Sequence, residues 1–528
     1  MSVHLPLYEH LYAVSDIHMG GRRDSEENFQ IFDRGQRLGN LIDHISNQHK
    51  DEEVCLVLNG DIIDSLAEDE VNGYVALDGE TAVRMMDHIF TDASFVAVWD
   101  PLARFVGRPK KHLVLVVGNH DIELGLPVVA YAIKRRLASD EDAAARIHFA
   151  TDGGGIACRV GGARVFCTHG NELDEWNWVD FTKLGELANA TNAGRAVDPS
   201  KWKANAGTRL VVDVMNKVKR RYPIVDILKP EAAAVASVLV ALDKEAFKYV
   251  DLDDVIPMLR AKVKGGLVTR NLLSAEALDF AGVSPTDLAE ESARHLLGSN
   301  FQTALEERRR EYRRDERRFL EDDLLLDAEK AFQGEPSAVS TALAESEEGT
   351  LGVWDIVKGW VGLVSKPEGL RRALQDWLKD DQTFDVGHAD KLYEAMQDRI
   401  GSQVDFTITG HTHKPRALAL KRGDGYYYNC GTWIRTLRLT EEALAEPKDF
   451  EKRVWPLLTA RNMATLDKAQ IPGPGRKRVP LLFDRTNVVQ ISVDGNRTVG
   501  KLLRVTDGDT EEKIRLETEP GTTPFEVG

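Results

Sequence analysis

Short apolar runs recur along the first third of the chain, and stretches with helical spacing separate them. The runs lie at 11–16, 53–61, 112–121 and 163–171. Continuous apolar runs are typical of strands that are buried on both faces. Between them, apolar positions within 29–46 and within 82–90 recur every three or four residues, which is typical of amphipathic helices. The pattern therefore predicts an α/β sheet with helices outside it.

The middle of the chain has a different pattern. From about residue 172 to residue 385, strand-type runs nearly vanish, and charged residues are mixed with apolar residues at helical spacing. This predicts a mainly helical insertion that is far longer than an ordinary loop. Strand-type runs return at 404–411 and 426–433. A DG turn between two alternating runs in 487–505 predicts a β-hairpin.

These changes of pattern divide the chain. A length of 528 residues is too great for one compact core. We expect one α/β core in two parts, at 1–185 and 386–440, with the helical insertion at 186–385 between them. Residues 441–528 then form a C-terminal extension that contains the hairpin.

Composition disfavours several classes of protein. The net charge of −17 argues against strong non-specific binding of nucleic acid, because such binding needs a basic surface. The net charge does not exclude a local basic groove. The four cysteines form no CxxC pair, which argues against a disulfide framework or a structural zinc site. We see no secretory signal pattern, and the longest apolar run is about half of the ~20 residues that span a bilayer. We therefore expect a cytoplasmic protein, with peripheral membrane contact left open.

Residues with metal-binding side chains follow one strand-type run after another. In chain order they are Asp16 and His18; Asp61 and Asp64; Asn119, His120 and Asp121; His169; and His411 and His413. In an open α/β sheet, ligands bind beyond the carboxyl ends of the strands, so we expect these side chains to meet in one crevice. One D-x-H triplet arises easily by chance, whereas five such strand ends in one chain do not.

The donor atoms indicate the kind of metal. Seven residues are candidate ligands: Asp16, His18, Asp61, Asn119, His169, His411 and His413. Imidazole, carboxylate and amide donors without thiolates suit Mn²⁺, iron or Zn²⁺. Seven ligands are too many for one tetrahedral ion but fit two ions that share a bridging carboxylate. Asp61, on a central strand, is the candidate bridge.

The motif series SDIH, NGDIID, GNHD, THGN and GHTH resembles that of the calcineurin-like metallophosphoesterase superfamily. The resemblance covers about 11–173 and 404–435. It implies a four-layer αββα sandwich, here with a large helical insertion. It also implies hydrolysis of a phosphodiester, pyrophosphate or phosphomonoester bond by a metal-activated hydroxide. The implied cofactor is a pair of divalent cations, with manganese favoured over iron or zinc.

The resemblance also implies roles for single residues. One cation is expected on Asp16, His18, Asp61 and His413, and the other on Asp61, Asn119, His169 and His411. His120 matches the family's catalytic histidine, which contacts the phosphate and can protonate the leaving oxygen. Asp121 is expected to orient that ring. Asp64 is expected to hold the metal ligands in position without binding a cation itself. Arg22 and Arg23 follow the first motif and are candidate phosphate-binding residues, with a solvent-exposed turn as the alternative.

Finer motif details suggest a subgroup. SDIHMG, THGNELD and the run from GHTHKP to YYYNCGTW look like the subgroup that contains UDP-2,3-diacylglucosamine pyrophosphatase, whose insertion clasps lipid chains. The insertion here is several times longer, and THGN replaces the usual HGD. A different substrate is therefore an equally good expectation. Trp176, Trp178 and Phe181 are either a core on which the insertion docks or an apolar, base-stacking wall of the substrate pocket.

Two other functions stay open. One is a metal-dependent nuclease of the same superfamily, in which the arginine-rich stretch 306–321 would grip a nucleic-acid strand, although a solvated helix is the favoured interpretation of that stretch. The other is an interaction scaffold with a residual metal site. A residual site would have lost ligands, and all seven candidate ligands are present, so this function is disfavoured. Protein partners that bind through the helical insertion are compatible with either.

Overall fold

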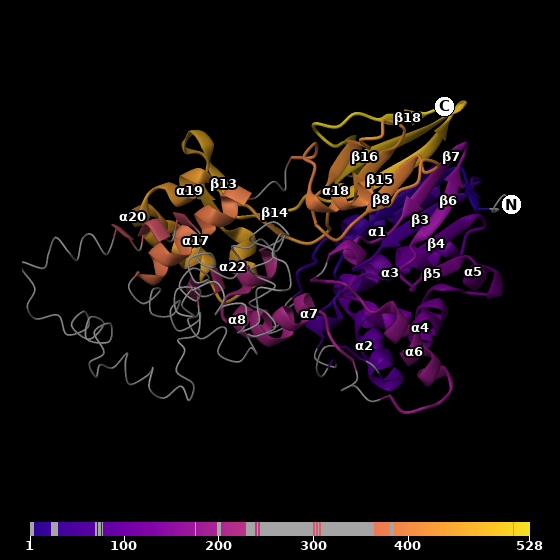
Figure 1. The fold of residues 1–528 in the computed structure, drawn as a ribbon, viewed down its shortest axis with the longest axis horizontal. Helices are drawn as coiled ribbons and strands as arrows, with labels where there is room; N and C mark the ends of the chain where they lie inside the picture. The colour runs from indigo at the N-terminus through magenta and orange to yellow at the C-terminus, as the bar shows by residue number, and fades with distance from the viewer. Residues whose placement is uncertain are drawn as a thin grey trace, which may run out of the picture.

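The computed structural model describes residues 5–22, 30–68, 71, 75–76, 78–174, 176–197, 202–228, 238–239, 241–242, 299–300, 302–304, 306–307, 364–380, 385–509 and 512–528. These residues form a two-sheet sandwich flanked by helices, with a smaller group of helices beside it (Figure 1). The mixed α/β class predicted from the sequence is therefore confirmed.

The larger sheet carries the first three predicted strands at its centre. Its parallel strands are β2 (His10–Val14), β3 (Val54–Asn59), β4 (Lys111–Val116) and β5 (Ile147–Ala150). Its antiparallel strands are β15 (Asn487–Asp494), β16 (Arg497–Asp507), β17 (Ile514–Thr518) and β18 (Phe525–Val527). The order is β17-β16-β15-β2-β3-β4-β5, and β18 pairs with β16. All residues of β2 and β3 are buried, as their continuous apolar runs predict.

The smaller sheet joins parts of the chain that lie far apart in sequence. In spatial order its strands are β1 (Leu7–Tyr8), β6 (Ile156–Val160), β7 (Ala163–Cys167), β8 (Phe406–Thr409), β10 (Tyr426–Asn429) and β9 (Arg416–Ala419). Strand β7 pairs in parallel with β8 across the whole predicted insertion. The two parts of the predicted core therefore meet in one sheet, although the domain boundaries themselves stay a prediction.

The layers follow from the two faces of each strand. Ala13 and Val57 on the larger sheet share an apolar cluster with Val165 and Ile408 on the smaller sheet. The other face of the larger sheet packs against α1 (Gly35–Gln48) and α3 (Ala93–Val106), while Tyr427 of the smaller sheet packs against α18 (Lys391–Gln397). The order is helix, sheet, sheet, helix. Further helices are α2 (Gly79–Thr91), α4 (Pro127–Leu137) and α5 (Glu141–Ala145).

The predicted hairpin is present as β15 and β16, joined at Asp494 and Arg497. It is not an appendage. Strand β15 pairs antiparallel with β2, from Val489 opposite Ala13 to Ser492 opposite His10. The last part of the chain therefore supplies the neighbour of the strand that leads to Asp16.

The described part of the predicted insertion is helical. Helix α6 (Phe181–Asn192) crosses the predicted boundary at 185/186, and α7 (Ala206–Leu210), α8 (Asn216–Lys219) and α17 (Lys366–Asp380) lie within the predicted insertion. Helix α17 docks on α19 (Glu441–Ala445), where Arg371 Nη1 donates to the Leu444 carbonyl oxygen at 2.7 Å. Around it lie α20 (Pro447–Asp449), α21 (Trp455–Leu458), α22 (Met463–Lys468), β11 (Thr436–Leu437), β12 (Gln470–Pro472), β13 (Arg478–Pro480) and β14 (Leu482–Phe483). The arginine-rich stretch lies outside the described residues from Arg308 onward.

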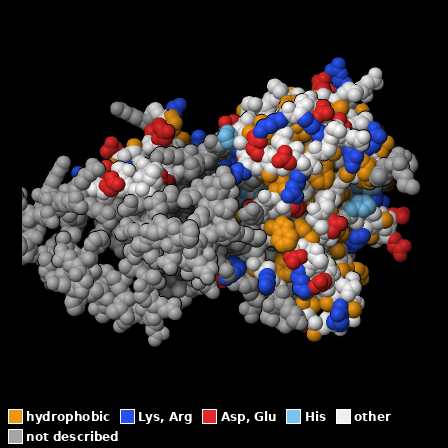
Figure 2. Space-filling view, in the orientation of Figure 1, with side chains coloured by type: hydrophobic (Ala, Val, Ile, Leu, Met, Phe, Trp, Pro, Cys, Tyr) orange, Lys and Arg blue, Asp and Glu red, His pale blue; other side chains and the backbone are white. Residues whose placement is uncertain are grey.

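Two surface properties bear on the predicted partners. On the face shown in Figure 2, Lys and Arg side chains are interspersed with Asp and Glu over the sandwich. In the part of the chain that the structure describes, no helix has the length and apolar character needed to cross a bilayer.

Candidate metal centre

The candidate ligands lie beyond the carboxyl ends of strands that point to one edge of the sandwich. Strands β2, β3 and β4 are parallel, as are β7 and β8. Backbone hydrogen bonds tie the loops together: the N–H groups of Ile17 and His18 both donate to the Asp61 carbonyl oxygen at 2.9 Å. The N–H of Gly410 donates to the His169 carbonyl oxygen at 2.8 Å. These bonds join the loop after β2 to the loop after β3, and the loop after β7 to the loop after β8.

Three overlapping groups of side chains at this edge have the arrangement of a cation site; one is His18, Asp64 and His120, and the other two share the Asp61 carboxylate. In each group, one donor atom per residue lies within 4.8 Å of the others. Of the two groups that share Asp61, the first is Asp16, His18, Asp61 and His413, and the second is Asp61, His169 and His411. This division is the one that the motif resemblance implies, apart from Asn119, whose donor is an amide.

The closest approaches are between imidazole nitrogens and carboxylate oxygens. His169 Nε2 lies 3.2 Å from Asp61 Oδ2, and His413 Nε2 lies 3.2 Å from Asp16 Oδ1. His18 Nε2 and His413 Nε2 face each other at 3.3 Å. Atoms that carry lone pairs therefore converge from separate loops, as ligands of a shared cation do.

Five candidate ligands have a left-handed backbone conformation, which non-glycine residues rarely adopt. Their φ angles are 53° for Asp16, 53° for His18, 48° for Asp61, 68° for His411 and 58° for His413. Among the described residues, Lys110 is the one other non-glycine residue with a positive φ. Such conformations cost on the order of 1–3 kcal/mol each and persist where the surrounding structure imposes them. Their concentration here indicates a functional site.

Two glycines allow the backbone to pass close to the ligands. A Cβ atom on Gly118 would lie 2.1 Å from Asp61 Oδ1, and one on Gly60 would lie 2.3 Å from His169 Nδ1. Gly60 also has a φ of +85°. Any larger residue at either position would push into a candidate ligand. The glycines of the NGD and GNH motifs therefore shape the pocket around Asp61 and His169.

The central carboxylates are held in their charged form. Burial raises the pKa of Asp61, but His169 and His120 outweigh burial and hold it well below its ordinary value. Burial and His413 act on Asp16 in the same opposed way, and its pKa is also lowered. Burial lowers the pKa of His169, yet Asp61 and Asp16 raise it to about 10. Cation binding would release the proton of His169, as metal binding to imidazole requires.

Asp64 contacts the ring of His120. Asp64 Oδ1 lies 3.3 Å from His120 Nδ1. The carboxylate of Asp121 instead accepts the N–H groups of Gly118 and Ile62, each at 2.6 Å. Burial and the Asp61 charge raise the pKa of Asp121 to about 7. Asp121 thus fixes the backbone of two ligand loops, while its predicted role in orienting the ring of His120 and any catalytic role stay predictions.

Sequence reasoning missed the groups that orient the imidazoles. His169 Nδ1 donates to the Asn59 carbonyl oxygen at 2.8 Å, which directs Nε2 toward Asp61. His411 Nε2 lies 3.0 Å from Asp174 Oδ2. Asp174 ends the THGNELD segment, so a carboxylate shortly after His169 was a signal in the sequence. The Asn59 contact uses a backbone atom and leaves no such signal.

Asn119 provides a test of whether the site fits a cation. Its side chain is 7% exposed, and its Oδ1 atom is buried with no hydrogen-bond partner among the described residues. An unsatisfied buried amide oxygen is costly. A divalent cation of the kind that binds carboxylate and imidazole also accepts an amide oxygen. The residues present therefore fit a divalent cation, while the identity of the metal stays a prediction.

The predicted substrate-binding residues are only partly described. Arg22 is half-buried, and Arg23 lies outside the described residues. Trp176 is 6% exposed and belongs to the main apolar core, together with the partly buried Phe181. Trp178 is 51% exposed. Of the two interpretations of this segment, the core role fits Trp176 and Phe181, while Trp178 is available to a ligand.

Comparison with protein families agrees with this geometry. No curated protein and no solved structure matches the chain. One family model matches residues 10–228, a segment that holds the candidate ligands from Asp16 to His169. His411 and His413 lie beyond the match and are placed beside it by the fold. Residues 10–228 are matched by the calcineurin-like phosphoesterase family, which implies a metal-dependent hydrolase of phosphate esters.

Proposed function

We propose that this protein is a phosphoesterase that uses two divalent cations to hydrolyse a phosphodiester, pyrophosphate or phosphomonoester bond. The observation that carries the proposal is that Asp61 belongs to both groups of candidate ligands. A carboxylate that serves two groups is what a pair of closely spaced cations requires. The family match over residues 10–228 supports the same chemistry.

The proposed ligand sets use every candidate from the sequence. The first cation site consists of Asp16, His18, Asp61 and His413, and the second of Asp61, Asn119, His169 and His411. We favour manganese, with iron or zinc as alternatives, because imidazole, carboxylate and amide donors suit these ions. When bound, such a pair of cations neutralises the charge of the phosphoryl group and lowers the pKa of a water molecule so that hydroxide exists near neutral pH.

His120 is the proposed general acid. Its ring centroid lies 4.7 Å from that of His18, and its side chain is 11% exposed, so it stands at the rim of the centre. Asp64 holds the ring through Nδ1, and Nε2 is then the atom that would donate a proton to the leaving oxygen. The backbone N–H of His120 also donates to Asp61 Oδ1 at 2.8 Å, and this bond fixes the position of the proposed acid relative to the shared ligand. A positioned acid typically contributes 10²–10⁴-fold.

The substrate side of the proposal rests on two residues. Arg22 follows the first motif, where a guanidinium would hold a phosphate oxygen by charge-assisted hydrogen bonds. Trp178 follows Asp174, the partner of His411, and presents an exposed aromatic face. We therefore expect a phosphate ester whose leaving group or second substituent has an apolar or aromatic surface.

The test is hydrolysis by the full chain. The protein is stripped with EDTA and reloaded with Mn²⁺. It is then assayed with bis(p-nitrophenyl) phosphate, p-nitrophenyl phosphate, a nucleoside-diphosphate sugar and a single-stranded oligonucleotide. We expect Mn²⁺-dependent hydrolysis of at least one of the first three. A protein that binds two equivalents of Mn²⁺ yet hydrolyses none of them would contradict the proposal. Cleavage of the oligonucleotide alone would select the nuclease reading instead.

A further inference from the structure

A second cluster of histidine and carboxylate side chains lies at the opposite end of the larger sheet. His10 begins β2, His49 follows the last residue of α1, and Glu52 lies in the turn before β3. One donor atom from each residue lies within 4.8 Å of the other two. The candidate metal centre lies beyond the carboxyl end of β2, so the length of that strand, on the order of 15 Å at about 3.3 Å per residue, separates the two places.

The Glu52 carboxylate lies against both imidazoles. Its Oε2 atom is 3.2 Å from His10 Nε2 and 2.5 Å from His49 Nδ1. The two rings approach with centroids 3.8 Å apart and planes inclined by 31°. His10 and His49 are 8% and 6% exposed, while the Glu52 side chain is 44% exposed. Two buried imidazoles and a carboxylate at the solvent boundary thus converge on one point.

We propose that His10, His49 and Glu52 bind a divalent cation of the zinc class, at a site separate from the candidate metal centre. Two imidazole nitrogens and one carboxylate oxygen form a donor set that zinc uses when it keeps a position for water. Glu52, whose carboxylate lies against both imidazoles at the solvent boundary, supplies the anionic ligand. The cation would join the end of α1 to the amino ends of β2 and β3.

The surroundings of His49 orient its ring for this role. Tyr12 Oη lies 2.9 Å from His49 Nε2, and Gln490 Nε2 donates to Tyr12 Oη at 2.7 Å. When His49 Nε2–H donates to Tyr12, the lone pair of Nδ1 points to the side of Glu52. Hydrogen bonds of this kind from the distal nitrogen are usual for metal-bound histidines and fix the ring.

The charges around the cluster leave the Glu52 side chain to the cation. The ammonium of Lys111 donates to the backbone carbonyl oxygen of Glu52 at 2.9 Å. The neighbouring carboxylate of Glu53 pairs with His112 at 3.1 Å. Glu9 accepts the N–H of Glu53 at 2.7 Å, which brings a further negative charge to the same end of the sheet.

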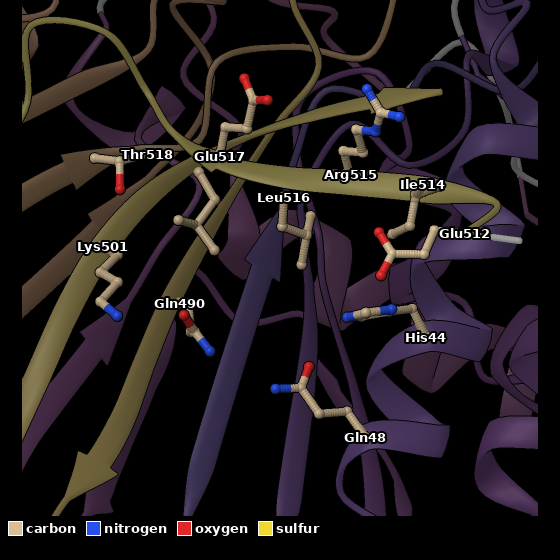
Figure 3. A pocket seen from close by; sticks show the side chains of 11 residues that line it. His44, Gln48, Gln490, Lys501, Glu512, Ile514, Arg515, Leu516, Glu517 and Thr518 are labelled. Atoms are coloured by element: carbon tan, nitrogen blue, oxygen red, sulfur yellow. The ribbon is translucent and has the colours of Figure 1, made fainter. Parts of the chain in front are cut away.

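A cleft of about 580 Å³ adjoins Gln490, the partner of Tyr12, and is not lined by His10, His49 or Glu52. Gln490, which donates to Tyr12, lines the cleft together with His44 and Gln48 from α1. In Figure 3 these three side chains extend from α1 and β15 below the strand that carries Ile514 to Thr518. The Glu52 side chain, which is 44% exposed, marks the side from which a cation reaches the buried imidazoles.

The experiment counts bound zinc in the full-length protein. Wild type, Glu52→Gln and the neighbouring control Glu53→Gln are stripped with EDTA, loaded with Zn²⁺, desalted and measured by elemental analysis. We expect wild type and Glu53→Gln to hold one equivalent more than Glu52→Gln. Because the expected result is a difference of one equivalent, it does not depend on how many ions the proposed hydrolase centre binds.

Glu52→Gln keeps the size of a partly exposed side chain, so we expect it to fold. In the same preparations, Zn²⁺ should raise the Tm of wild type more than that of Glu52→Gln, and turnover of a phosphate ester with Mn²⁺ should be the same in both. Equal zinc content in the two proteins would overturn the site and leave a hydrogen-bonded His–Glu–His cluster. Loss of turnover in folded Glu52→Gln would overturn its separation from the candidate metal centre.

Discussion

The carboxylate of Asp174 lies 3.0 Å from Nε2 of His411, in the segment that leads into the predicted insertion. The same carboxylate accepts the N–H of Trp176 at 3.0 Å and the side-chain amide of Asn177 at 2.8 Å. One side chain therefore connects a proposed metal ligand to the backbone just before α6. Any movement of this segment would therefore change the position of the His411 ring.

We predict that Asp174→Asn weakens binding of one of the two cations and lowers turnover by about 10–100-fold, the usual effect of losing a partner of a metal-bound histidine. The substitution keeps the shape of the side chain but removes the charge that orients His411. Titration of EDTA-stripped protein with Mn²⁺, followed by turnover at saturating Mn²⁺, measures both effects. The exposed Asp51→Asn is the matched control and should behave as wild type. Unchanged Mn²⁺ affinity in Asp174→Asn would contradict the prediction.

Asp61→Asn should lower metal content more than the same change at Asp16. Asp61 belongs to both groups of candidate ligands, whereas Asp16 belongs to one. Elemental analysis of the two Mn²⁺-loaded variants makes the comparison, with circular dichroism to show that each is folded. Two full equivalents in folded Asp61→Asn would exclude the bridging role.

His120→Ala should keep both cations and lose most turnover, by about 10²–10⁴-fold, because the proposed acid is removed while every proposed ligand stays. Hydrolysis of bis(p-nitrophenyl) phosphate and elemental analysis are the two readouts. His148→Ala, an exposed histidine on β5, is the control. Wild-type turnover in His120→Ala would contradict the proposed role of His120 as general acid.

Gly118→Ala should reduce both stability and metal content. The added Cβ would lie 2.1 Å from Asp61 Oδ1 and 2.4 Å from the Asp61 backbone nitrogen, so the ligand loop must shift. Overpacking of this kind costs about 1–3 kcal/mol in free energy of unfolding. The control is Gly162→Ala, where an added Cβ has no heavy atom within 4 Å among the described residues. Urea unfolding of the two variants should separate them, and equal midpoints would show that the loop tolerates the methyl group.

Stability should depend on pH through Glu368 of α17. Burial raises its pKa, but hydrogen bonds from Arg371 and Arg372 outweigh burial and hold it below the ordinary value. A lowered folded-state pKa adds stability above the unfolded-state value, and that stability is lost as the pH falls through the folded-state value. Glu368→Gln should therefore be less stable than wild type near pH 7, by about 1–2 kcal/mol, and the difference should shrink in acid.

Urea unfolding at several pH values measures this difference. Glu80→Gln on α2 is the control, since Glu80 also pairs with an arginine four residues away but its side chain is 85% exposed. Exposed pairs of this kind contribute little. A Glu368→Gln difference that is the same at pH 7 and in acid would rule out the pair as its cause.

The layered fold and the meeting of the candidate ligands could be predicted because their signals are local. Continuous apolar runs such as 53–61 indicate buried parallel strands, and the ends of parallel strands lie at one edge of a sheet. Asp16 and Asp61, which follow the neighbouring parallel strands β2 and β3, therefore meet at that edge, whereas His169 follows a strand of the smaller sheet and reaches Asp61 through the packing of the two sheets.

Other features have no local signal. The pairing of β15 with β2 joins residues at opposite ends of the chain, and the hairpin pattern alone does not say which strand it will join. Asp16 and His411 have a left-handed backbone, and their N–H groups donate to the Gly60 carbonyl oxygen and to the Asp16 carboxylate, respectively; residue type alone does not specify this conformation. The cluster of His10, His49 and Glu52 depends on the packing of α1 on the sheet, so spacing along the chain gives no hint of it.

The pairing of β15 with β2 also has a consequence for how the protein forms on the ribosome. Strand β2 leads directly to Asp16, and its edge toward β15 has no strand beside it until residues 487–494 have been made. An open edge of this apolar kind invites pairing with other chains. During synthesis, therefore, the strand that leads to the first proposed ligand is completed only when residues 487–494 emerge, and until then its apolar edge is open to pairing with other chains.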